Sequence, residues 1–288
     1  MAIPNSGRSC AAAGARPRRQ AAQRCLAFAP GLVLLLILGF AWMASPTQLC
    51  AQAEPSESAI AYYRRLYQEA RKTWRSETNR AETALRFAAA CFDWADFVSD
   101  QSQRADIAQE GIQAARRAVA LEPKDAAGYY YLALDLGRLA QTKFLGALKL
   151  VNEMEVNFKR STELDPKLDF SGAHRSLGLL YRDAPGWPTS LGDRGKARNH
   201  LKKAVELSPD YPDNQLTYLE SLLNWGEKKA VAEQIATVET ILKNARERLT
   251  NDASRFNWPD WDKRWEKIKS RADVVAARPP KGGNTPRD

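Results

Sequence analysis

Apolar and small residues recur at helical spacing along most of the chain, and three of these runs end at a repeated tripeptide. The tripeptides Leu121-Glu122-Pro123, Leu164-Asp165-Pro166 and Leu207-Ser208-Pro209 place their prolines 43 residues apart. Because proline has no amide hydrogen and restrains the residue before it, each tripeptide predicts the end of one helix and room for the next. A fixed period closed by a helix stop indicates a helical repeat array, whose units bury their apolar faces against one another.

A small residue stands three positions before each leucine, namely Ala118, Ser161 and Ala204. Small residues where helices cross, with large apolar residues between them, are typical of tetratricopeptide (TPR) repeats, whose usual period is ~34 residues. The longer period here is explained by insertions between the two helices of a unit, most visibly in residues 183–192. The sequence therefore predicts an all-α fold without strands: a TPR-like array of helical hairpins, or α-solenoid, with long insertions.

The apolar periodicity also predicts the individual helices. They are expected over about 58–75, 78–98, 105–121 and 128–137, in a run from 144 to the stop at 166, around 177–181, from 197 to the stop at 209, from 216 to 226, over about 230–248, and in a short last helix over about 260–272. That last helix is expected to cap the open end of the array. Prolines and glycines from residue 276 onward predict a disordered tail.

The first 53 residues carry a different pattern. Five arginines precede an apolar stretch from Leu26 to Ala44, and Ala51-Gln52-Ala53 then stands before polar residues. This order predicts a secretory signal peptide over 1–53, cleaved after Ala53, and export to the periplasm. The alternatives are an uncleaved membrane anchor, since ~17–25 apolar residues can span a bilayer, and lipid attachment at Cys50, which Leu49 disfavours. The domain organisation is thus a signal peptide, a repeat domain over 54–275 and a tail over 276–288.

Charge and cysteine usage narrow the function classes. The net charge is +9, and removal of the five N-terminal arginines leaves +4. Nucleic-acid binding requires a concentrated basic stripe, which this interspersed charge does not provide. Only Cys91 remains after cleavage, so neither a disulfide framework nor a cysteine metal site is expected. Its apolar surroundings predict a buried free thiol.

No constellation of catalytic or cofactor-binding residues is recognisable. Residues 192–196 resemble a phosphate loop, but Ala197 stands where the Ser or Thr that binds magnesium should be, so a loop leading into a helix capped by Asp193 is the better interpretation. His174 and His200 have no second ligand at helical spacing, so no metal site is predicted. We therefore expect neither catalysis nor a bound cofactor.

Aromatic residues are the candidates for binding a ligand or a partner. Trp187 stands between two prolines in the long insertion, where it could form a contact or fold back as a lid on its own helix pair. Tyr129, Tyr130 and Tyr131 are consecutive, so they cannot share one face of a helix, and at least one should lie off the core face. That tyrosine could meet a groove or a ligand, or it could pack against the previous unit. Tyr181 is the fifth aromatic candidate for binding a ligand or a partner.

The secretion signal, the three long-period units and the segment 171–178 after Leu164-Asp165-Pro166 together resemble the T-component family of tripartite periplasmic (TRAP) transporters. The stretch from about 126 to 226 carries the likeness, including Gly186, Gly192-Asp193 and Lys196-Ala197. The resemblance implies a periplasmic all-helical protein that encloses a small hydrophobic cavity, binds a solute-binding subunit and can form a homo-oligomer. It brings no catalytic residues. Leu49-Cys50 departs from the family's usual lipid anchor.

The sequence thus favours a periplasmic helical-repeat binding protein that assists solute uptake, with a protein partner, a small apolar ligand, or both. The alternative is a generic TPR scaffold that holds partners during envelope assembly. An enzyme would require a polar constellation that the sequence does not show.

Overall fold

The computed structural model describes residues 57–143 and 146–276, and this part of the chain is helical without a strand. Its elements are α1 (Glu57–Ser76), α2 (Ala81–Ala95), α3 (Gln101–Leu121), α4 (Ala126–Gln141), α5 (Ala147–Leu164), α6 (Leu168–Asp183), α7 (Arg194–Leu207), α8 (Pro212–Asn224), α9 (Lys228–Ala232), α10 (Ile235–Arg248) and α11 (Asp252–Ala276). The predicted fold class is therefore confirmed.

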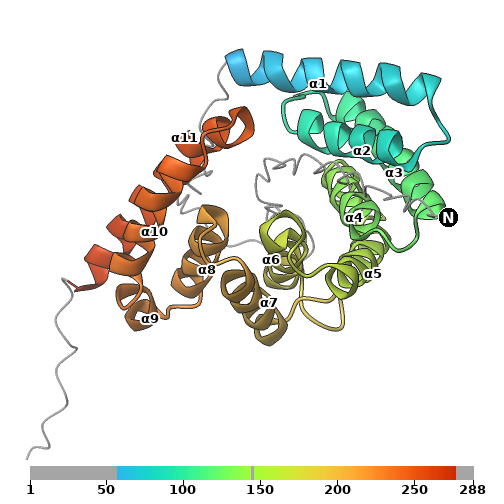
Figure 1. Ribbon diagram of the computed structural model, residues 1–288. Helices are drawn as coiled ribbons and strands as arrows, with labels where there is room; N and C mark the ends of the chain where they lie inside the picture. Colours follow the sequence, from blue (N-terminus) through green and yellow to red (C-terminus); the bar gives the residue numbers. More distant parts are fainter. Residues whose placement is uncertain (1–56, 144–145, 277–288) are drawn as a thin grey trace, which may run out of the picture.

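Consecutive helices pack as antiparallel hairpins, α2 with α3, α4 with α5 and α6 with α7. The hairpins follow one another around a curve, with α2, α4, α6 and α8 on its inner side and α3, α5 and α7 on its outer side (Figure 1). We call the first group the inner helices. The repeated tripeptides end the outer helices, since α3, α5 and α7 stop at Leu121, Leu164 and Leu207 as predicted.

Capping side chains fix where several helices begin. The carboxylates of Asp100 and Asp193 accept hydrogen bonds from the backbone N–H groups of Gln103 and Lys196, at 2.7 and 2.9 Å. Such a bond satisfies an amide that the helix itself leaves without a partner. The Asp193 cap confirms that residues 192–196 form a loop leading into a helix.

Small residues lie where helices approach closely. Ala118, Ser161 and Ala204 are buried on α3, α5 and α7. Gly178 of α6 faces Leu201 of α7, and a β-carbon at Gly178 would stand only 2.5 Å from the Leu201 side chain. The packing of small against large residues predicted for this unit is therefore present. The hydrophobic core forms two clusters, one from α1 to the first turn of α7 and one over α8–α11.

The first and last helices of the array meet. The ring of Phe256, in the first turns of α11, lies 5.4 Å from the ring of Tyr62 and 6.1 Å from that of Tyr63, both on α1. Tyr63 also stacks on Phe97 at 4.9 Å. This aromatic contact brings the two ends of the curve together (Figure 1).

Several helix boundaries differ from the predictions: α3, α6 and α8 begin earlier, at Gln101, Leu168 and Pro212, and two further differences lie in the C-terminal part. The last helix begins at Asp252 instead of 260, because Pro259 lies inside α11 and does not start it. The predicted helix over 230–248 is divided into α9 and α10 near Glu233. No helix within 57–143 and 146–276 is both long and apolar enough to cross a bilayer. The predicted signal peptide and nearly all of the predicted tail lie outside the described residues.

Candidate partner-binding surface

Buried ion pairs join the inner helices to one another and to α11. The Nε atom of Arg175, on α6, lies 3.0 Å from Oδ2 of Asp213 on α8, and both side chains are about 2% exposed. The other oxygen of Asp213 accepts a bond of 2.5 Å from Arg264 of α11. Arg264 also holds both carboxylate oxygens of Glu220, at 2.8 and 2.9 Å. Because buried charges are tolerated only when paired, this network specifies how these helices pack.

A strained turn begins α6 at the inner side. Asp169, Phe170 and Ser171 have φ angles of 48°, 54° and 62°, in the left-handed region that residues with a side chain rarely adopt. Contacts from both neighbouring inner helices hold the turn. Tyr130 of α4 donates a hydrogen bond of 2.7 Å to Asp169, and Phe170 stacks on Tyr211, just before α8, at 4.3 Å. Strain of this kind persists only where the surroundings enforce it, and it often marks functional sites.

Several buried polar atoms on α4 and α6 have no hydrogen-bond partner among the described residues. They include both carboxylate oxygens of Asp135, Nε and Nη2 of Arg138, and Oδ1 of Asp169. Arg138 is 3% exposed, pairs with Asp96 at 3.0 Å through its remaining nitrogen, and stacks on Phe92 at 4.4 Å. Burial raises the pKa of Asp135 well above its usual range, and it raises that of Asp169 to about 7. We call Asp135, Arg138, Asp169, Arg175 and Asp213 the inner polar seam.

The two histidines meet between α6 and α7. Nδ1 of His174 lies 3.0 Å from Nδ1 of His200. Because the two residues lie on different helices, residue spacing within one helix does not predict this contact. Burial and the neighbouring His200 and Lys203 lower the pKa of His174 to about 4, and burial lowers that of His200 as well. The described part of the chain contains no group of three or more His, Cys, Asp or Glu side chains that could hold a metal ion.

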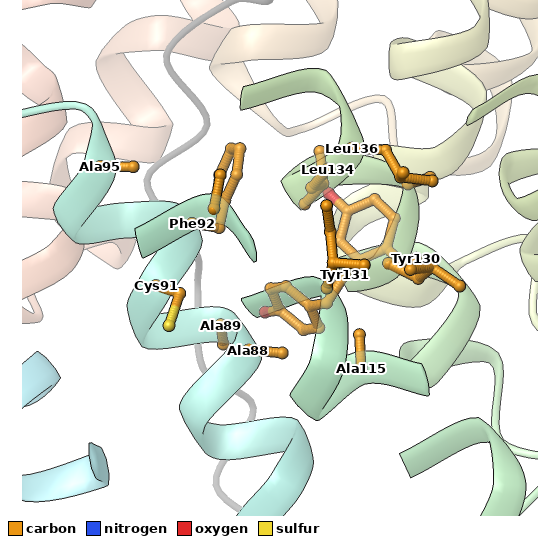
Figure 2. Packing of buried hydrophobic residues seen from close by; sticks show 14 of the residues in the cluster. Ala88, Ala89, Cys91, Phe92, Ala95, Ala115, Tyr130, Tyr131, Leu134 and Leu136 are labelled. Carbon is orange, nitrogen blue, oxygen red and sulfur yellow. The ribbon is translucent and has the colours of Figure 1, made fainter. Parts of the chain in front are cut away.

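The tyrosines proposed as binding residues lie mostly within the core. Tyr130 and Tyr131 are among the buried residues shared by α2, α3 and α4 (Figure 2), with their rings 5.3 Å apart. Tyr129 is half-buried and donates a hydrogen bond of 3.1 Å to the carbonyl of Pro123. Tyr181 is 1% exposed, and its hydroxyl donates a bond of 2.5 Å to Glu155 of α5. Cys91 is a buried free thiol, as predicted.

Trp187 is separate from these tyrosines. It lies in the loop between α6 and α7 and is 88% exposed, so it does not cover its own helix pair as a lid would. The structure therefore does not gather the five aromatic candidates into one site. Whether any of them binds a ligand or partner stays a prediction.

Sequence reasoning missed the inner polar seam, although a signal was present. Asp135 interrupts the apolar run Leu132-Ala133-Leu134 and Leu136, and Arg175 precedes Leu177 on a helix with few exposed positions. A charged residue inside an apolar run is informative, because burying it is costly unless it is paired. Their partners on neighbouring helices could not be predicted from spacing along one chain.

The helical hairpins, small-to-large contacts and curved array define a TPR-like helical repeat protein. A crystal structure of TTC0263, a thermophilic TPR protein of Thermus thermophilus, superposes with a TM-score of 0.53 at 18% sequence identity, covering 74% of this chain and 93% of that one. A crystal structure of MamA covers 77% and 95% of the two chains at 14% identity, with a TM-score of 0.38. Because the TTC0263 chain is only 18% identical to this one, its similarity supports the fold and not a shared function.

Residues 49–173 match the family model described as regulator of microtubule dynamics protein 1-3. This match spans less than half of the chain. No curated protein matches the sequence. The resemblance to TRAP T-components rests on the sequence motifs and stays a prediction.

Proposed function

We propose that this chain is a non-enzymatic helical-repeat protein that binds a protein partner through its inner helices. The observation that carries the proposal is the set of unpartnered polar atoms on the inner polar seam. A buried polar group without a partner costs about 1–3 kcal/mol, so a surface serving packing alone would favour apolar side chains. A partner that supplied the missing hydrogen bonds would recover that free energy on binding.

The chemistry of the seam indicates which groups such a partner presents. Nε and Nη2 of Arg138 form the edge of the guanidinium that holds a carboxylate with two parallel hydrogen bonds. Asp135, whose raised pKa favours the neutral acid, can both donate and accept. Peptide carbonyls, peptide amides and carboxylates therefore fit these atoms. An extended polypeptide segment would present such groups once a shift of the inner helices exposes Asp135 and Arg138, which are 0% and 3% exposed.

Photo-cross-linking in cells tests the proposal. A photoreactive phenylalanine analogue replaces Phe170, a half-buried residue beside Asp169, and in a control replaces the exposed Thr240 of α10. We expect a discrete adduct from position 170 that is lost in an Arg138→Met chain and is not formed from position 240. Adducts that form equally from both positions, or that persist without the guanidinium, would contradict binding at the inner helices.

The more specific role that we propose is accessory binding in TRAP-type solute uptake, with a periplasmic solute-binding subunit as partner and a small apolar ligand inside the array. The motifs between 126 and 226 and the export signal before Glu54 support it. Native mass spectrometry of the exported protein is the test. A bound lipid-sized ligand or a co-purifying solute-binding subunit supports this role, whereas an empty monomer favours a general TPR scaffold.

The family match over 49–173 favours a second candidate, a role in binding cytoskeletal filaments. Co-sedimentation with polymerised microtubules distinguishes it from the first. Saturable binding that is weakened by Arg138→Met would support this candidate, and absence of the chain from the pellet would exclude it.

A further inference from the structure

The exposed apolar side chains of the described residues gather around α5 and the loop before α7. Leu148 and Val156 of α5 and Trp187 are the large hydrophobic residues left exposed, at 47%, 65% and 88%. The outer helices α5 and α7 run in the same direction along the array, so Leu148, in the first turn of α5, lies at the same end as the loop that carries Trp187. Leu148 and Trp187 thus lie at the same end of the array, and Val156 lies about two turns further along α5.

Hydrogen bonds within the loop hold Trp187 away from the core. The backbone N–H groups of Thr189 and Gly192 donate to the carbonyls of Gly186 and Pro185, at 3.0 and 2.8 Å. Gly192 also approaches the chain so closely that a β-carbon there would stand 2.1 Å from the Ala184 carbonyl oxygen. An ordered loop that presents an indole to solvent loses little conformational entropy when that indole binds.

Basic residues follow the Trp187 loop along α7. The helix carries five lysines and arginines against a single acid, Glu206. Arg194 and Arg198 are paired with Glu227. Lys202 and Lys203 have side chains 64% and 52% exposed, at 3.8 Å from Glu206, and Lys196 lies one heptad before Lys203 on the same face. Lys202 and Lys203 thus share one acidic neighbour, whereas Lys196 lies over the Tyr181 ring at 5.2 Å and lowers the pKa of Glu155.

The pKa values of the neighbouring histidines agree with this positive potential. After burial and the other histidine, Lys203 contributes to lowering the pKa of His174. After burial, Lys159 of α5 contributes most to lowering the pKa of His200, Glu155 opposes it, and Lys196 adds to the lowering. Lysines from both α5 and α7 therefore act on the same region.

We propose that this outer face, formed by Leu148, Val156, Trp187, Lys196, Lys202 and Lys203, docks on the surface of a bilayer that contains anionic lipids. Indole and short apolar side chains favour the headgroup region, and lysines close to it are attracted by lipid phosphates. A folded acidic protein could pair with the lysines, but it would also need a pocket complementary to the protruding Trp187 indole, which a lipid headgroup region does not require. The face is formed by α5, α7 and the loop before α7, so docking there does not cover the inner helices.

Vesicle binding with a readout at the face itself tests the proposal. Because residues 26–44 are apolar and would bind any bilayer, total binding of the full chain is not sufficient. Fluorescence quenching is measured in a Trp42→Phe background, because Trp42 lies within that apolar stretch. The vesicles contain phosphatidylcholine and phosphatidylglycerol (about one lipid in three anionic), and their acyl chains are brominated near the headgroup. We expect quenching that is absent from a Trp187→Phe chain and weak with phosphatidylcholine alone.

A charge variant supplies the second measurement. Lys196→Gln, Lys202→Gln and Lys203→Gln together should lower the Trp187-dependent partitioning at least tenfold, since each lysine near an anionic surface contributes about a fivefold factor. The matched control replaces Lys228, Lys229 and Lys243, exposed on α9 and α10, and should leave it within about twofold. Unchanged melting temperatures show that both variants are folded.

Three results would overturn the proposal. The first is quenching that persists in the Trp187→Phe chain, and the second is an equal loss in both triple variants. The third is binding to single-stranded RNA that is tighter than vesicle binding and depends on the same residues, because an aromatic side chain beside basic residues can also stack on bases.

Discussion

A single methyl group at Gly178 tests the helix crossing on which the third hairpin depends. Two opposing effects determine the result. Replacing a glycine inside a helix by alanine stabilises the helix by about 1 kcal/mol. At Gly178, however, the new β-carbon would stand 2.5 Å from both Cγ and Cδ2 of Leu201 and 3.2 Å from its backbone nitrogen. The leucine cannot retreat as a flexible side-chain end would, because its Cγ and backbone are both involved.

The magnitude follows from these distances. Overpacking of a core costs about 1–3 kcal/mol, and a contact this close belongs at the upper end of that range. Gly178→Ala should therefore lower the free energy of unfolding by a net ~2 kcal/mol after the helix gain is subtracted. For a domain of about 150–250 residues this corresponds to a fall of ~4–8 °C in melting temperature. Urea unfolding followed by circular dichroism measures the free energy, and a thermal scan measures the melting temperature.

Two comparisons make the reasoning refutable. Gly195, in the exposed first turn of α7, would bring its β-carbon only within 3.2 Å of the Asp193 carboxylate, so Gly195→Ala should leave stability unchanged or raise it. In a Leu201→Ala background the obstruction is gone, and Gly178→Ala should then stabilise the chain by about 1 kcal/mol. If Gly178→Ala stabilises the otherwise unchanged protein, the close crossing is wrong.

The remaining predictions concern other sites. Ala204→Trp should lower the unfolding free energy by about 1–3 kcal/mol or more through overpacking, whereas Trp187→Ala should barely change the melting temperature because the indole is 88% exposed; equal melting of the two variants would contradict that exposure. Arg175→Ala removes one of the two guanidinium groups that pair with the buried Asp213 carboxylate and leaves only Arg264, so it should cost about 3 kcal/mol in urea unfolding. The pKa of His174 is lowered to about 4 from an ordinary 6.5, so the neutral imidazole contributes stability that is complete above about pH 6.5 and is lost as the pH falls toward 4. Between about pH 7.5 and 5, the free energy of unfolding should therefore fall more in the wild type than in His174→Gln. Equal falls in the two proteins would refute this. N-terminal sequencing of the exported protein should begin at Glu54, and a lipidated start at residue 50 would replace the soluble interpretation.

The repeat pattern predicted much of the fold because its signals are local. Proline ends a helix through its own geometry, so the ends of α3, α5 and α7 at Leu121, Leu164 and Leu207 follow from the tripeptides. The start of α11 was predicted at 260, whereas packing of the flanking turns keeps the helix continuous from Asp252 through Pro259. A local preference was overridden there by tertiary contacts.

The candidate site was much less predictable, because it depends on contacts between repeats. Asp169–Ser171 contain no glycine, so nothing in their sequence indicates a left-handed turn. The turn is held by Tyr130 and Tyr211, each about 40 residues away along the chain. The His174–His200 pair likewise arises from a helix crossing and not from spacing within one helix.

The meeting of Tyr62 and Tyr63 with Phe256 changes how the array should unfold. In an open solenoid each end has a neighbour on one side only, so terminal repeats fray first and unfolding spreads inward. Here the first and last helices are neighbours, and neither is a free end. Unfolding must first separate this aromatic contact, after which α1 and α11 become ordinary termini. Amide exchange in these two helices should therefore be slow in the intact protein and should accelerate in both together when Phe256 is replaced by alanine, although the substitution lies on only one of them.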